Sequence, residues 1–175
     1  MNNTFKIIIL FLILFIPLEK KLLANDIYFV DYSKVMNESV AGKKAQTYLK
    51  KLLTDSNKKF NETAKKLKEE ENKIISQKNA LSKEEYRKKA DALRKKVSDF
   101  NKQREKSIKD VARKRKKAGD EMLKNLNPVL GKYMQDNNIS VVIDKKNVLM
   151  GDKKFEITSQ IIEILNKEFK SINLN

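Results

Sequence analysis

Two aspartates that follow apolar segments, Asp31 in DIYFVD and Asp144 in ISVVID, are the first candidates for chemistry. Two carboxylates can act as general acid and general base when their environments separate their pKa values. The sequence contains no His and no Cys, which excludes Cys/His zinc sites, Cys nucleophiles and His-dependent triads. It also lacks the glycine-rich phosphate loops and the GxSxG motif. We therefore interpret Asp31 and Asp144 as strand-end or turn-capping residues, and the sequence predicts no enzyme and no cofactor.

A run of five basic residues is the second candidate, and it comprises Arg113, Lys114, Arg115, Lys116 and Lys117. Basic runs occur in nucleic-acid sites, but this one has no interleaved aromatic residues for base stacking and no zinc ligands. Five consecutive helical positions surround the whole helix rather than one face. Two interpretations stay open, an anion-attracting patch on an arm and an ordinary solvated stretch of charged helix. We predict no nucleic-acid partner.

The first 24 residues have the pattern of an export signal. Lys6 precedes an apolar run from Ile7 to Leu18, which is long enough for a signal-peptide core and too short to span a bilayer. We expect cleavage after Ala24, although Leu22 and the charges at 19–21 also suit an uncleaved anchor. Export weakens any nucleic-acid function, and a DNA-coating protein stays an alternative only if this segment fails as a signal.

The sequence between the two candidate aspartates predicts two long helices. Apolar residues at steps of three and four predict a helix from Val40 to about Gln77. A break is expected near residue 80, where Ser82 and Glu85 form a capping-box pattern. A spacing of 3.5 residues then continues from Tyr86 to residue 122, which is typical of a coiled coil. Two such helices of about 60 Å, joined by a short turn, must lie antiparallel as a hairpin.

The segments at the two ends predict a small β-containing body. Strands are expected at 26–31, 139–144 and 148–150, a short new helix from Pro128, and a last helix capped by Thr158. The predicted fold class is α+β, with a long antiparallel helical-hairpin (coiled-coil) arm over 39–127. It projects from an oligomerisation body built from 25–38 and 128–175.

The strands of this body are apolar on both faces, so we expect other copies of the chain to cover them. The residues predicted to form the oligomer interface are Ile27, Phe29, Val141, Ile143, Val148 and Met150.

Two segments near the ends of the chain are distinctive: IYFVDYSKVMNES with Asp31, and NNISVVIDKKNVLMG with Asp144, followed by EIT at 156–158. In these segments most specifically, the chain resembles the Skp/OmpH family of periplasmic chaperones. Glu156 stands where the family usually has Asp, and Met150 stands where an aromatic residue is common. The arm matches in length, charge and periodicity.

This resemblance implies a homotrimer in the periplasm whose three arms surround a cavity. Members of the family hold unfolded outer-membrane β-barrel proteins there without ATP. We therefore expect unfolded outer-membrane proteins as partners, with no cofactor. A binder of anionic membrane or lipopolysaccharide surfaces through the basic arms is the alternative.

The charge of the arm and the apolar residues near its tip are the predicted binding features. Residues 43–127 carry 28 basic and 13 acidic side chains, so +15 of the chain's net charge of +16 lies there. Such a field attracts anionic partners. The tip residues could instead only seal the hairpin turn. The predicted client-binding residues are Leu67, Ile74, Ile75, Leu81, Tyr86, Arg87 and Lys88.

Overall fold

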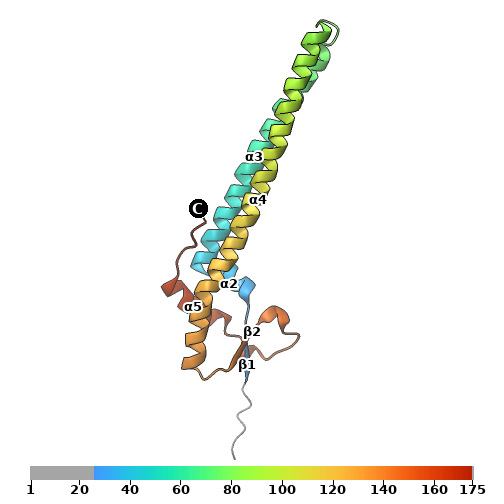
Figure 1. Cartoon of the computed structure of the whole chain (residues 1–175). Coiled ribbons are helices and arrows are strands. Elements are labelled where there is room, and N and C mark those ends of the chain that lie inside the picture. The colour runs from blue at the N-terminus through green and yellow to red at the C-terminus, as the bar shows by residue number, and fades with distance from the viewer. Residues whose placement is uncertain (1–25, 175) are drawn as a thin grey trace, which may run out of the picture.

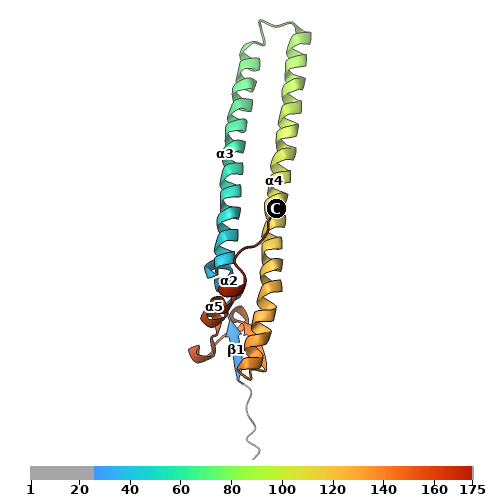
Figure 2. The same ribbon diagram turned by 90° about the vertical axis from the view of Figure 1, so that its left-hand side faces the viewer.

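The computed structural model describes residues 26–174, which form a long helical arm on a small mixed body (Figure 1). The signal peptide predicted over residues 1–24 lies outside the described residues. Helix α3 spans Val40–Ser76 and helix α4 spans Lys83–Asp136. The two helices run antiparallel and are joined by a turn at the far end, as the view from the side shows (Figure 2). The hairpin expected from the sequence is confirmed.

The beginning of each arm helix is fixed by a serine. The hydroxyl of Ser39 accepts a hydrogen bond from the backbone amide of Gly42 at the start of α3. The Ser82 hydroxyl accepts a hydrogen bond from the amide of Glu85, and the Glu85 carboxylate accepts one from the amide of Ser82, which completes a capping box. These bonds satisfy amides that have no partner within the helix. The helix start predicted at Ser82 is therefore confirmed.

The helix boundary predicted at Asn127 and Pro128 is wrong, because α4 continues through both residues to Asp136. Proline inside a helix removes one hydrogen bond and usually bends or ends the helix. Here Pro128 is exposed, whereas Leu126 and Val129 on either side of it are buried in the body. Their packing holds the helix together across the proline. The second arm helix is thus also the main helix of the body.

The body contains a small parallel sheet. Strand β1 spans Ile27–Val30 and pairs with strand β2, Val141–Asp144, so that Ile27 lies opposite Val141. A third strand predicted at 148–150 is wrong, since these residues form a bend between two short 3-10 helices, Lys145–Asn147 and Lys153–Phe155. Only an isolated bridge from Phe29 to Glu156 extends the sheet in the described chain.

Two further helices complete the body: α2, Tyr32–Glu38, and α5, Thr158–Glu168. The sequence did not predict α2, which is seven residues long. The cap predicted at Thr158 is wrong, because Ile157 occupies that position without a side-chain bond. The Thr158 hydroxyl instead accepts a hydrogen bond of 2.9 Å from the amide of Asp31.

One hydrophobic cluster holds the body together. It joins residues from β1, α2, α4 and α5, so the start and the end of the described chain are packed on the same helix. The largest of its fully buried side chains are Val35, Met122, Leu126, Ile157, Ile161 and Leu165. The predicted α+β class, with a helical arm and a small β-containing body, is confirmed.

Two helical glycines provide a test of this packing. At Gly131 of α4 a methyl group would meet no atom within 4 Å, so Gly131→Ala should stabilise the helix by about 0.5–1 kcal/mol. At Gly42 the methyl carbon would lie 2.1 Å from the carbonyl oxygen of Met36, so Gly42→Ala should destabilise by about 1–3 kcal/mol. Urea unfolding followed by circular dichroism measures both. Equal effects of the two substitutions would contradict the close packing of α2 against α3.

Candidate functional site

The arm is closed firmly at its two ends and weakly along its middle. On α3 no side chain between Leu49 and Ile74 is buried, and on α4 none before Val111 is buried. Along this stretch the seam, which is the line of contact between α3 and α4, consists of half-buried and exposed residues. A buried aliphatic side chain contributes about 1.5–3 kcal/mol. Because such residues are missing here, little free energy opposes bending or separation of the two helices.

A few specific contacts hold the middle of the arm. The rings of Phe60 and Phe100 meet edge to face at 5.9 Å between centroids. The hydroxyls of Ser56 and Ser107 lie 3.3 Å apart in a polar layer nearer the body. Towards the tip, the Lys96 amine lies 2.6 Å from the carboxylate of Glu70 on the other helix. These contacts set the register of the hairpin but exclude little water.

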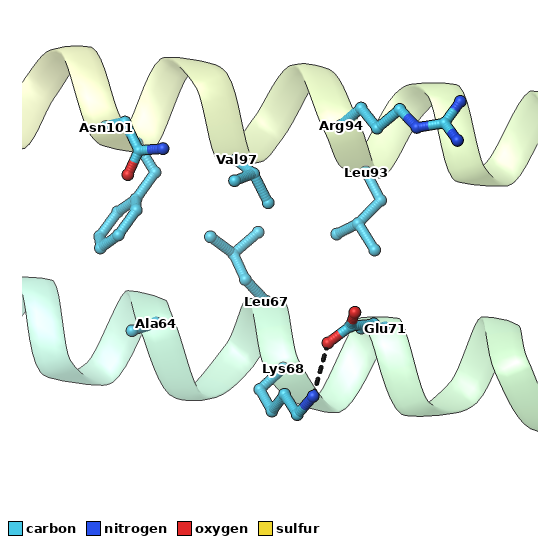
Figure 3. Close-up of a pocket in the computed structure, with 9 residues that line it drawn as sticks. Ala64, Leu67, Lys68, Glu71, Leu93, Arg94, Val97 and Asn101 are labelled. Carbon is cyan, nitrogen blue, oxygen red and sulfur yellow. Dashed lines mark hydrogen bonds and ion pairs between the residues drawn. The ribbon is translucent and has the colours of Figure 1, made fainter.

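Beside the aromatic pair the seam opens into a cleft with a cavity volume of about 490 Å³. Figure 3 shows the two helices across this cleft, with Leu67 of α3 pointing towards α4 and Val97 and Leu93 of α4 pointing back. Its apolar lining is Ala64, Leu67, Leu93, Val97 and Phe100. Val97 is 39% exposed although it faces the partner helix. Lys68, Glu71, Arg94 and Asn101 complete the lining.

The residues predicted to bind clients lie in different environments along the arm. Ile74 is buried close to the end of α3 and the hairpin turn. Leu81 and Tyr86 are half-buried, while Ile75 is 56% exposed. Leu67 lies in the cleft rather than near the tip. Arg87 and Lys88 are exposed and border a hollow at the tip together with Glu84, Glu85 and Asp91.

The basic run surrounds α4, as its helical periodicity predicts. Arg113 pairs with Asp110 and Lys116 pairs with Asp120, and both cations are largely exposed. Arg115 is also exposed, whereas Lys117 is half-buried. These residues behave as a charged helix surface. Lys114 differs from the others.

The amine of Lys114 interacts with the C-terminal tail and with an aromatic ring of α3. It donates a hydrogen bond to the backbone carbonyl of Leu174 and lies 5.7 Å from the centre of the Tyr48 ring. Leu174 is 6% exposed and packs with Ala45 of α3 and Ala118 of α4. In Figure 1 the C-terminal segment leaves α5 and runs along the arm to this place. This contact was not predicted from the sequence, where the apolar residues Ile172 and Leu174 in the C-terminal tail are its signal.

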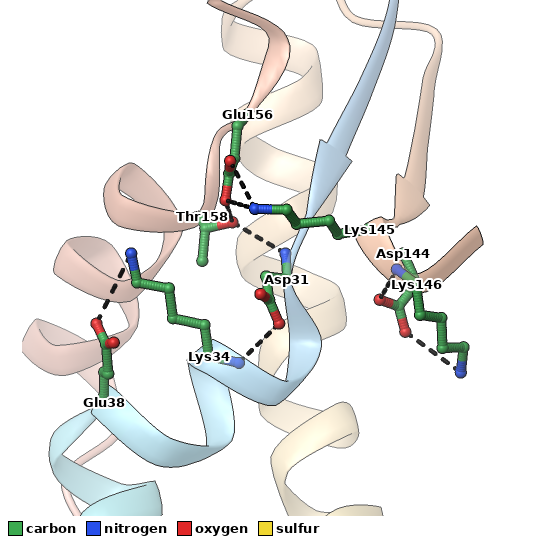
Figure 4. A network of polar contacts seen from close by, with 8 residues as sticks. All are labelled: Asp31, Lys34, Glu38, Asp144, Lys145, Lys146, Glu156 and Thr158. Atoms are coloured by element: carbon green, nitrogen blue, oxygen red, sulfur yellow. Dashed lines mark hydrogen bonds and ion pairs between the residues drawn. The ribbon is translucent and has the colours of Figure 1, made fainter. Parts of the chain in front are cut away.

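A polar network joins the two ends of the body (Figure 4). The Lys145 amine lies 3.0 Å from both carboxylate oxygens of Glu156, and Glu156 accepts a hydrogen bond of 3.1 Å from the Thr158 hydroxyl. Thr158 in turn accepts from the amide of Asp31. The hydrogen bond from Lys145, followed by that from Thr158, holds the pKa of Glu156 below its ordinary value of 4.5. The network fixes β1, the end of β2 and the start of α5 relative to one another.

Asp31 and Asp144 have the capping roles expected from the sequence. The Asp31 carboxylate accepts a hydrogen bond of 2.8 Å from the amide of Lys34 at the start of α2. Asp144 accepts one of 3.2 Å from the amide of Lys146 in the following 3-10 turn. Next to Asp31, the Tyr32 hydroxyl donates to the carbonyl of Gly119 at 3.0 Å, and burial raises the pKa of this tyrosine. The two caps are local, and the bond from Tyr32 attaches the start of α2 to α4.

Several of the predicted interface residues lie at the surface of the single chain. Ile27 and Val141, which are neighbours on the two paired strands, are 55% and 42% exposed, and Met150 is 93% exposed. Phe29 is buried within the chain, and Ile143 and Val148 are half-buried. The exposed members are therefore apolar side chains at the surface of the body, as is Leu149, whose side chain is fully exposed.

No cluster of three or more metal-ligating side chains occurs within residues 26–174. Over the same described stretch, no helix is both long and apolar enough to cross a membrane.

The chain is thus an α+β protein in which one long helical hairpin projects from a small body with a two-stranded sheet. Its family is the OmpH-like outer membrane proteins, which it matches over residues 26–165. A similar solved structure is a candidate outer membrane chaperone (OmpH-like) from Caulobacter crescentus CB15, with 18% sequence identity and a TM-score of 0.76. The similarity covers 84% of this chain and 87% of that chain, and at this identity it shows the fold. A search of curated proteins finds no sequence match.

The polar network provides a test with a pH dependence. Glu156→Gln should lower the free energy of unfolding by about 1 kcal/mol at neutral pH, because a charge-assisted bond becomes a neutral one. Since the pKa of Glu156 is lowered by folding, its contribution is present above pH 4.5 and is lost as the pH falls below that value. The difference between variant and parent should therefore shrink in acid.

Glu163→Gln is the matched control. Its partner is Lys167 in an exposed pair on α5, with Glu163 73% exposed, and such pairs contribute about 0–1 kcal/mol. Urea unfolding of both variants at neutral and acidic pH makes the comparison. A Glu156 effect that is independent of pH would show that the network does not act through its charge.

Proposed function

We propose that this protein is an exported, ATP-independent holdase chaperone that binds unfolded outer-membrane β-barrel proteins in a cavity between the arms of a homotrimer. The single observation that carries this proposal is the arm: a strongly basic helical pair whose middle buries no side chain. Membership of the OmpH-like family supports it. So does the described fold, which resembles that of the Caulobacter protein, a candidate outer membrane chaperone.

The arm has the chemistry that an unfolded β-barrel protein needs from a holdase. Such a client exposes alternating apolar side chains and is often acidic. The arm offers half-exposed apolar residues, including Val97 at 39%, Leu53 at 42% and Ile108 at 60%, within a net charge of +15 over residues 43–127. Weak contacts distributed over a long surface can hold many sequences without a fixed site, and the positive field gathers acidic chains.

The body supports the proposed assembly. Its sheet has two strands only in the described chain, and Ile27, Val141, Leu149 and Met150 are exposed apolar residues of the body. A small sheet beside exposed apolar residues is stabilised when another copy pairs with its edge or covers those residues. Three copies that meet there would direct three arms around one space.

The second candidate function, binding of anionic membrane or lipopolysaccharide surfaces, is favoured by the exposure of Arg87 and Lys88 near the tip. The same hollow also contains Glu84, Glu85 and Asp91, and Arg87 lies 3.9 Å from the Asp91 carboxylate. Mixed charge at the tip suits a flexible protein partner better than a uniformly anionic surface. Flotation with anionic vesicles in the absence of a client separates the two candidates.

The proposed assembly predicts that Val141→Asp dissociates the homotrimer. Val141 is 42% exposed in the single chain, so the substitution should leave each subunit folded while placing a charge in the interface. Leu53→Asp is the matched control, because Leu53 has the same exposure but lies on the arm. Analytical ultracentrifugation measures the mass of each variant. Trimers that persist in Val141→Asp would place the interface elsewhere.

The proposed electrostatic capture predicts that affinity for an acidic unfolded β-barrel protein falls as salt rises. The Debye length shortens from about 10 Å at 0.1 M salt to about 3 Å at 1 M, which screens exposed charges. Fluorescence anisotropy of a labelled client, diluted from urea into increasing sodium chloride, measures this. An affinity that does not change with salt would remove the charge of the arm from the mechanism.

A further inference from the structure

The C-terminal tail shows how this arm holds an extended piece of polypeptide. Residues 169–174 contain no helix or strand, and they run back from α5 along the base of the arm. Two contacts attach the end of this segment. The side chain of Leu174 packs where Ala45 of α3 and Ala118 of α4 leave room, and its carbonyl accepts a hydrogen bond from Lys114.

The mid-arm cleft has three of the same elements, namely one small residue, an apolar lining and nearby cations. Ala64 is the small residue on α3, and Leu67, Leu93 and Val97 supply the apolar walls (Figure 3). Lys68 and Arg94 stand at its rim, where Lys114 stands at the base. The cavity of about 490 Å³ is large enough for one bulky apolar side chain and the backbone beside it.

We propose that the mid-arm cleft, defined by Ala64, Leu67, Leu93, Val97 and Phe100, binds one apolar side chain of an extended client segment. The neighbouring carbonyls and carboxylates of that segment bind Lys68 and Arg94. This proposal rests on the proposed chaperone function and assigns a specific site to it. The site lies within the helix pair of a single arm, so each arm carries its own.

The lining carries two cations, Lys68 and Arg94, against one carboxylate, Glu71, and this excess of positive charge favours an acidic extended polypeptide as the occupant. Lys68 now pairs with Glu71 at 2.7 Å and Arg94 pairs with Asp91 at 2.7 Å, and both cations are more than two-thirds exposed. Exposed pairs of this kind contribute about 0–1 kcal/mol, so an entering carboxylate or carbonyl can take over the cation at little cost. The half-open seam lets the helices adjust to side chains of different size.

Ala64→Leu tests the site by filling the cleft from α3. We expect the dissociation constant of an acidic, urea-denatured β-barrel protein to rise about tenfold, the effect of losing one buried aliphatic contact. Ala92→Leu is the matched control, because Ala92 is exposed on α4 outside the cleft lining. Circular dichroism checks that both variants keep the helical content of the parent.

A second measurement does not depend on how Ala64→Leu folds. The chain contains no Cys, so Val97→Cys and Ala92→Cys each provide a single thiol whose alkylation rate can be followed. We expect the denatured β-barrel protein to slow the alkylation of the thiol at 97 severalfold and to leave the thiol at 92 unchanged.

The outcomes separate this site from the proposed function. If the parent protein binds the client but Ala64→Leu binds it equally well and the thiol at 97 reacts at its free rate, the site is wrong and the chaperone function stands. If the parent does not bind the client at all, both fail. Protection of the thiol at 97 by phosphatidylglycerol vesicles, without protection by the denatured protein, would assign the cleft to lipid chains and overturn the proposal.

Discussion

A helix in water is stable where its apolar stripe meets a second surface, and along the arm α3 and α4 have only each other. This constraint decides how the molecule divides its stability. At the base, α4 gains α2, α5 and β1 as neighbours, and Met122 and Leu126 are fully buried. Beyond Val111 the two helices lose these neighbours and bury no side chain until Ile74 near the turn. The protein is thus firm at the body and weakly held along the arm.

The same constraint connects the arm to the properties expected of a holdase. A deep, well-packed groove would select one sequence, because its walls would reject side chains of the wrong shape. A shallow seam with half-exposed apolar residues and many lysines imposes little shape. Local opening of such a seam requires little free energy, so movement of the two helices would let the proposed cleft and the seam beside it accommodate side chains of different sizes.

Periodicity and caps were sufficient to predict the arm from the sequence, whereas the body was only partly predictable. Ser82 and Glu85 act locally, so their capping box could be recognised from spacing alone. Pro128 misled the prediction because its effect was decided by the burial of Leu126 and Val129, which is a tertiary property. The segment 148–150 is apolar enough for a strand, but it has no neighbouring strand in the described chain. The cleft and the docked tail depend on which residues meet across the hairpin, which a spacing pattern does not specify.

The uninterrupted course of α4 through Pro128 has a mechanical consequence. Because one helix of 54 residues forms both the outer part of the arm and the centre of the body core, the arm has no joint at its base. A load applied near the turn would be transmitted along this helix to Met122, Leu126 and Val129, which pack with residues of α5 and β1 in the body core. Bending of the arm and the packing of the body core are therefore mechanically coupled through one continuous helix.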